Sequence, residues 1–137
     1  MLGDCESNSS MKLRIVVADD NAEFLAKIVS VLATEFEVVA TAADGKSALE
    51  CTRLYQPNVV VLDLEMPGSN GIEVVKELNK YPPSPAAVIC SIEDDPEIVE
   101  AARQAGALGY VFKRRIAQDL IAAVKSVACG QSFVSPP

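Results

Sequence analysis

The stretch Val59-Val60-Val61-Leu62-Asp63 decides the fold, because four consecutive apolar residues end at a carboxylate. A short, continuously apolar run of this kind is typical of a strand buried on both faces of a parallel sheet. A second such run, Ile15-Val16-Val17-Ala18, ends at the acidic pair Asp19-Asp20. Parallel strands place their carboxyl ends at one edge of the sheet, where open α/β folds bind their ligands. We therefore expect Asp19, Asp20 and Asp63 to converge in one crevice.

The rest of the chain repeats this pattern. Apolar strand-like runs alternate with amphipathic segments five times, which is typical of βα units that build a parallel sheet. Right-handed crossovers would place the helices on both faces of the sheet. The sequence thus predicts an α/β fold with a doubly wound, five-stranded parallel sheet. The expected strands are residues 12–18, 37–40, 59–63, 86–91 and 109–113.

Composition narrows the class of protein. A chain of 137 residues that is 50% hydrophobic is long enough for one globular domain with a sizeable core. No apolar run approaches the roughly 20 residues of a membrane span, and the first residues lack the basic start and apolar stretch of a secretory signal. We expect a cytoplasmic protein without membrane contact, in which residues 1–10 form a disordered tail. The net charge of −7 argues against strong nonspecific binding to nucleic acid.

The cysteines carry no motif. Cys5, Cys51, Cys90 and Cys129 are scattered without the short spacing of a metal or redox site. Because three of them lie in apolar or helical patterns, we expect buried free thiols.

Two more strand ends supply polar groups, since Ser91 closes the fourth expected strand and Lys113 closes the fifth. Three converging carboxylates repel one another unless a divalent cation joins them, and oxygen ligands suit Mg²⁺. An ammonium and a hydroxyl aimed at the same place would bind a phosphoryl group through charge-assisted hydrogen bonds. Asp63 is the expected nucleophile, whose attack on phosphorus would give an acyl phosphate.

Taken residue by residue, the chain resembles the receiver domain of two-component response regulators over about residues 12–135. The matching elements are Asp19-Asp20, Asp63 followed by Met66-Pro67-Gly68 and Gly71, Ser91, and residues 106–113. Their order and spacing carry the resemblance, because no single element would suffice. It implies the CheY-like, flavodoxin-like (βα)₅ sandwich.

The resemblance also implies roles for residues. A sensor histidine kinase would donate a phosphoryl group to Asp63, and Mg²⁺ would be held by Asp20, Asp63 and the main-chain carbonyl of Glu65, with Asp19 acting through water. Such a domain is not an enzyme for other substrates; it catalyses only its own phosphorylation and dephosphorylation.

The resemblance also implies that Lys113 would contact the phosphoryl oxygens. Two further residues, Ser91 and Tyr110, would form the switch. Ser91 would move to hydrogen-bond the phosphoryl group, and Tyr110 would rotate inward to fill the vacated space.

The tail, residues 119–137, resembles the last receiver helix and linker of NarL-type regulators. We accordingly expect a receiver at residues 11–130 and the start of a linker at 131–137, leading to a helix-turn-helix output domain that this chain lacks; the alternative is a stand-alone receiver. DNA would be bound only through that domain. Phosphorylation would control dimerisation or the output domain in transcription regulation.

Two alternatives stay open. A phosphatase or phosphotransferase of the haloacid dehalogenase type also uses a strand-end aspartate, but its Asp-x-Asp motif is replaced here by Asp63-Leu64-Glu65. A pseudo-receiver would bind partners without being phosphorylated. Ile92 keeps the second alternative open, because it stands where receivers frequently have a small residue and would narrow access to Asp63.

Two carboxylates flank the expected site, at positions that vary in the family. We hypothesise that Glu65 and Glu93 repel incoming anions and bias the entry of water, and so set the lifetime of the phosphoryl group.

Overall fold

The computed structural model describes residues 12–137 of the chain. The predicted disordered tail at residues 1–10, together with Cys5, lies outside the described residues. Within them, no helix combines the length and the apolar character that crossing a membrane would need.

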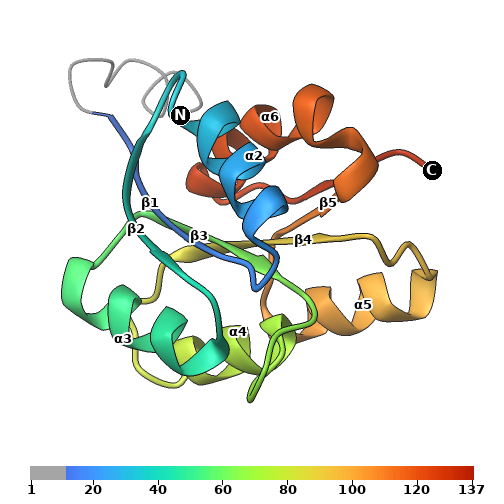
Figure 1. Cartoon of the computed structure of the whole chain (residues 1–137). Coiled ribbons are helices and arrows are strands. Elements are labelled where there is room, and N and C mark those ends of the chain that lie inside the picture. The colour runs from blue at the N-terminus through green and yellow to red at the C-terminus, as the bar shows by residue number, and fades with distance from the viewer. Residues whose placement is uncertain (1–11) are drawn as a thin grey trace.

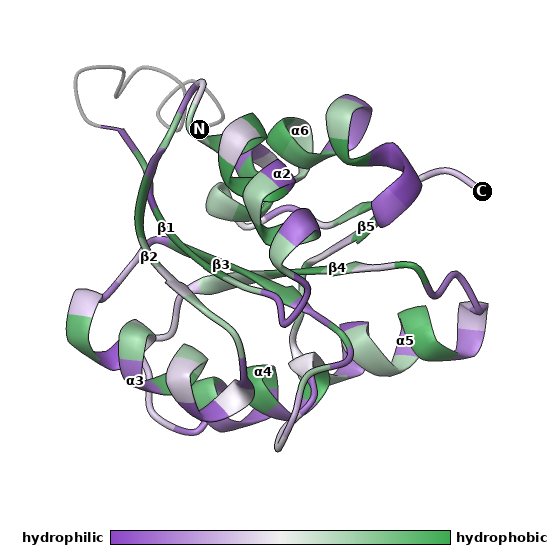
Figure 2. Cartoon of the chain, viewed as in Figure 1, coloured by the Kyte–Doolittle hydropathy of each residue, from purple (hydrophilic) through white to green (hydrophobic). Residues whose placement is uncertain are grey.

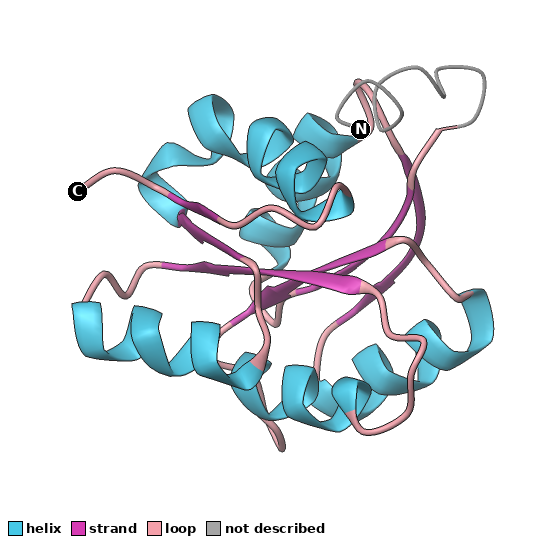
Figure 3. Cartoon of the chain, turned by 180° about the vertical axis from the view of Figure 1, so that it is seen from behind, coloured by secondary structure: helices cyan, strands magenta, loops and turns pink. Residues whose placement is uncertain are grey.

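The described part of the chain contains one parallel sheet of six strands in the order β2-β1-β3-β4-β5-β6. This arrangement confirms the predicted doubly wound sheet and adds a short sixth strand that the sequence patterns did not predict (Figure 3). The strands are β1 Arg14–Ala18, β2 Glu37–Ala42, β3 Val59–Asp63, β4 Ala86–Ser91, β5 Gly109–Phe112 and β6 Phe133–Val134.

Helices cover both faces of this sheet, as Figure 1 shows. They are α2 Ala22–Leu32, α3 Gly45–Tyr55, α4 Gly71–Asn79, α5 Pro96–Ala105 and α6 Ile116–Ala128, with a single 3₁₀ turn, η1 Lys113–Arg115, before α6. Helices α2 and α6 pack on one face and α3, α4 and α5 on the other, as the two core clusters show. Alternate residues of β1 and β3 enter the two clusters, which is why residues 15–18 and 59–62 are all apolar (Figure 2).

Capping side chains start two of the helices that follow the strands β1 and β3. Asn21 accepts the amide N–H of Phe24 at 3.0 Å, so α2 begins directly after the acidic pair. Asn70 and Glu73 form a capping box that starts α4. Gly71 is required there, because a Cβ atom at this position would lie 2.5 Å from the carbonyl oxygen of Asp63. The start of α4 is thus packed against the backbone of the expected nucleophile.

The cysteine prediction holds only in part. Cys51 and Cys90 are free, and Cys90 is buried, which raises the pKa of its thiol to about 12. Cys129, by contrast, is disulfide-bonded, so the predicted free thiol is wrong at this position. The lack of a short-range cysteine motif therefore did not exclude a disulfide.

Candidate functional site

The three carboxylates meet at the carboxyl edge of the sheet. Asp19 and Asp20 follow β1, Asp63 ends the neighbouring strand β3, and one oxygen from each residue lies within 4.8 Å of the others. Asp19 and Asp63 are buried, whereas Asp20 is exposed. The cluster therefore has one side open to solvent, from which a ligand can enter.

Lys113 joins this cluster from the far side of β4. Its Nζ atom lies 2.8 Å from Oδ2 of Asp19 and 3.3 Å from Oδ1 of Asp63, and the side chain is 7% exposed. Burial lowers the pKa of the ammonium, but Asp19 and Asp63 together outweigh burial and raise it. Lys113 therefore stays charged at physiological pH and points at the carboxylate that would accept a phosphoryl group.

The site carries more negative charge than the protein neutralises. The pKa of Asp63 is raised to about 6, first by burial and then by the charge of Asp19; Lys113 and the main-chain N–H of Glu65 offset this only in part. Three carboxylates and one ammonium leave a formal charge of −2 when all are ionised. Carboxylate oxygens with this charge fit a divalent cation of the Mg²⁺ kind.

Ser91 and Tyr110 are linked through one main-chain segment. The Ser91 hydroxyl accepts the N–H of Glu93 at 2.9 Å, and the Tyr110 hydroxyl donates to the carbonyl of Glu93 at 2.7 Å. Tyr110 is only 2% exposed, so its ring already occupies the inward position that the family resemblance associates with the switched state. The loop after β4 therefore connects the two predicted switch residues.

The three residues that the sequence analysis expected to flank the site differ in exposure. Glu65 is exposed and Glu93 is partly exposed. Ile92 is 71% exposed, so its side chain lies at the surface and not in the core.

Phe24 was missed by the sequence analysis as a residue of the site. Its ring centroid lies 4.3 Å from Nζ of Lys113, in a cation–π contact. The helical spacing of Phe24 had indicated only a core position on α2, and indeed it packs partly against that core. No sequence signal could have revealed this contact, because α2 and η1 meet only in the folded chain.

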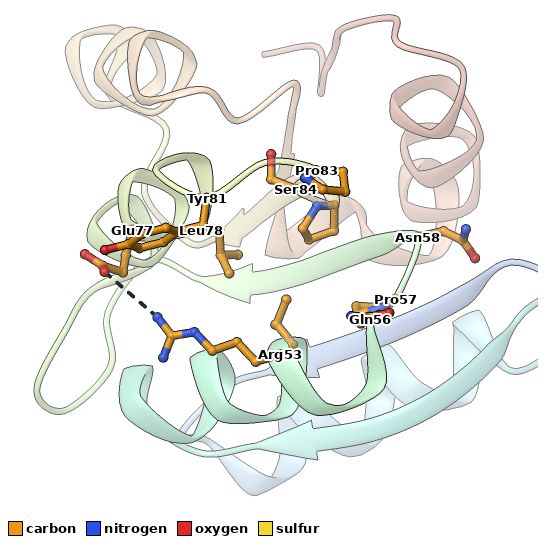
Figure 4. A pocket seen from close by; sticks show the side chains of 11 residues that line it. Arg53, Gln56, Pro57, Asn58, Glu77, Leu78, Tyr81, Pro83 and Ser84 are labelled. Atoms are coloured by element: carbon orange, nitrogen blue, oxygen red, sulfur yellow. Dashed lines mark ion pairs between the residues drawn. The ribbon is translucent and has the colours of Figure 1, made fainter.

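A groove lies elsewhere in the described part of the chain, at the amino ends of the strands (Figure 4). It has a volume of about 700 Å³ and lies between the carboxyl ends of α3 and α4 and residues 81–85. An ion pair between Arg53 and Glu77, 3.9 Å apart, spans it. It shares no residue with the carboxylate cluster, so the chemistry of the site does not depend on it.

Comparison with known proteins agrees with this geometry. Residues 15–125 match the model of the response regulator receiver domain. The chain belongs to the response regulator receiver family. It is therefore a receiver of two-component signal transduction, as the resemblance predicted, and the predicted fold is confirmed.

Individual relatives place this receiver among the NarL/LuxR-type regulators. It is 38% identical to the transcriptional regulatory protein DegU of Brevibacillus brevis over 96% of this chain and 56% of DegU. The signal receiver domain of NarL from Mycobacterium tuberculosis superposes with a TM-score of 0.77 at 33% identity, over 84% of this chain and 98% of that one. A LuxR-family regulator from Aurantimonas superposes with a TM-score of 0.86 at 28% identity, over 91% of each chain.

The receiver spans less than two thirds of its curated relatives, since it covers 56% of DegU and 59% of a NarL protein from Mycobacterium tuberculosis.

Proposed function

We propose that this receiver accepts a phosphoryl group on Asp63 from a sensor histidine kinase, in a reaction that depends on Mg²⁺. The observation that carries the proposal is the position of Lys113, whose ammonium lies 3.3 Å from Asp63 at the edge where three carboxylates meet. A buried carboxylate beside a fixed cation has the geometry needed to attack phosphorus and to stabilise the charge on the transferring oxygens.

The reaction forms one bond and breaks one. A carboxylate oxygen of Asp63 attacks phosphorus, and the bond from phosphorus to the nitrogen of the donor imidazole breaks, so that the electron pair leaves with the imidazole. Lys113 donates hydrogen bonds to the phosphoryl oxygens as they arrive. The domain turns over no separate substrate, because the phosphoryl group stays on Asp63 until water removes it.

Asp19, Asp20, Asp63 and the main-chain carbonyl of Glu65 would hold the Mg²⁺, Asp19 acting through water. When bound, the ion would neutralise charge on the phosphoryl oxygens. The raised pKa of Asp63, caused first by burial and then by the charge of Asp19, supports this assignment, because a bound cation would offset both effects.

Phosphorylation would then switch Ser91 and Tyr110 and control dimerisation or an output domain. The names of the relatives support a role in transcription regulation, and DNA contact would come only through a helix-turn-helix domain beyond this segment. The site of action would be the cytoplasm.

The test is incubation with acetyl phosphate, or with beryllofluoride, in the presence and absence of Mg²⁺, followed by intact mass or ligand-binding measurement. We expect a Mg²⁺-dependent adduct or complex that disappears in Asp63→Asn. A folded sample that responds to neither reagent would contradict the proposal and favour the pseudo-receiver, in which the exposed Ile92 restricts access.

A further inference from the structure

We infer that residues 131–135, the segment that follows α6, are held in a seat on the receiver and that this seat is energetically coupled to the phosphorylation site. The seat is defined by the outer edge of β5 and the side chains of Asp119 and Arg115. The inference rests on the proposed function and extends it, because it assigns a docking surface to the start of the linker.

The backbone of this segment adds a strand to the sheet. The N–H of Phe133 donates to the carbonyl of Leu108 at 2.9 Å, and the N–H of Ser135 donates to the carbonyl of Tyr110 at 2.9 Å. The resulting strand β6 runs parallel to β5, with Tyr110 opposite Val134. A segment that only connected two domains would not need this ladder.

A buried side-chain network fixes the end of the segment. The Ser135 hydroxyl donates to Oδ2 of Asp119 at 2.7 Å and accepts the N–H of Phe112 at 3.1 Å, and Ser135 is only 3% exposed. Arg115 donates to the same Asp119 oxygen at 2.7 Å. Ser135 is therefore a specific anchor, because an alanine would leave the buried N–H of Phe112 without its acceptor and would remove one of the donors to Asp119, which would keep only Arg115.

The seat is built from the backbone that carries the switch. Tyr110 and Phe112 bond to the linker through their main chains, and Lys113 follows Phe112 directly. Arg115 belongs to the same 3₁₀ turn as Lys113. Any shift of β5 that moves Lys113 relative to Asp63 would therefore move the partners of Ser135 as well.

The direction of the coupling follows from the arrangement in the structure. With the linker seated, Lys113 lies within 3.3 Å of Asp63 and the Tyr110 ring is inward. A phosphoryl group, or beryllofluoride, on Asp63 uses Lys113 in that same position, so it favours the seated state. Because coupling between two sites is reciprocal, the seated linker strengthens ligand binding at Asp63 by the same factor.

The experiment compares Ser135→Ala with Ser132→Ala in the full chain. Ser132 is an exposed serine three positions away and serves as the matched control. Beryllofluoride affinity is measured with saturating Mg²⁺, and hydrogen exchange of the Phe133 and Ser135 amides is followed with and without beryllofluoride. We expect Ser135→Ala to weaken beryllofluoride binding about fivefold, the low end of typical couplings, and beryllofluoride to slow exchange of both amides in wild type.

Other results would overturn the inference. Equal beryllofluoride affinity in Ser135→Ala and Ser132→Ala would show that the seat is not coupled to Asp63. This would hold even if the amide hydrogens of β6 exchanged faster in Ser135→Ala. Tighter binding in Ser135→Ala would reverse the direction of coupling. If Ser135→Ala did not fold, Asp119→Asn would take its place with the same expected weakening. A wild-type chain that binds no beryllofluoride would overturn the proposed function and this inference together.

Discussion

The ammonium of Lys113 lies 3.3 Å from the carboxylate of Asp63, although β5, which Lys113 follows, and β3, which Asp63 ends, are not adjacent in the sheet. Lys113 follows β5 and reaches across β4 to the end of β3. The same ammonium also pairs with Asp19 at 2.8 Å, so a single cation forms ion pairs with carboxylates at the carboxyl ends of both β1 and β3.

Removing this cation should slow phosphorylation sharply. Because a hydrogen bond to a charged group is worth about 1.5–3 kcal/mol, Lys113→Ala should lower the rate of phosphorylation by acetyl phosphate about 10- to 100-fold. Intact mass over time measures that rate. Lys125→Ala, which removes an exposed lysine that pairs with Glu35 on the surface, is the control and should match wild type. A rate in Lys113→Ala equal to that of the control would show that Lys113 does not contact the transferring group.

The stability of the metal-free protein should depend on the ionisation of Asp63. Its pKa is about 6 in the folded chain, against an ordinary value of 3.8. The folded state therefore binds the proton more tightly than the unfolded state, and stability should fall as pH rises from about 4 to about 6. Asp63→Asn should remove this fall and raise the free energy of unfolding at pH 7 by about 1–2 kcal/mol.

Urea unfolding in EDTA at several pH values tests this dependence. Parallel pH profiles of wild type and Asp63→Asn would contradict the raised pKa.

Divalent metal should reverse the repulsion among the carboxylates. Mg²⁺ at a hundredfold excess over its Kd should stabilise the fold by about 2.7 kcal/mol, a rise in Tm of about 10 °C. Asp20→Asn should lose most of this rise, whereas Glu50→Gln, an exposed carboxylate on α3, should retain it. The rise in Tm is measured by thermal unfolding of wild type and both variants with and without Mg²⁺. An equal rise in Asp20→Asn would place the ion at some other site.

The carboxylates of Glu65 and Glu93 should control how readily anions and water reach Asp63. Neutralising them with Glu65→Asn or Glu93→Ala removes repulsion of the anionic donor, so uptake of phosphoryl from acetyl phosphate should become severalfold faster. The lifetime of the phosphoryl group on Asp63 should change severalfold as well, as loss of the adduct in intact-mass spectra would record. Unchanged dephosphorylation in both variants would refute the hypothesis that these side chains set the lifetime.

Local patterns in the sequence were enough to locate five of the six described strands and to name the carboxylates that meet at their ends, but they missed β6. Strands β3 and β4 begin and end where the apolar runs predicted, and Asn21 caps the first helix as one of the two expected residues. The five polar strand-end residues could be assigned to one edge because parallel strands leave no other place for their carboxyl ends.

The sequence by itself determined the doubly wound sheet and the convergence of Asp19, Asp20 and Asp63, because burial on both faces and strand direction are properties of short segments. Tertiary structure alone decided the contact of Phe24 with Lys113, the bridge from Ser91 to Tyr110 through the Glu93 main chain, and the docking of Ser135 on Asp119. Each of these contacts depends on how a helix, loop or terminal segment approaches the sheet. That approach is set by packing between distant segments, and no local pattern records it.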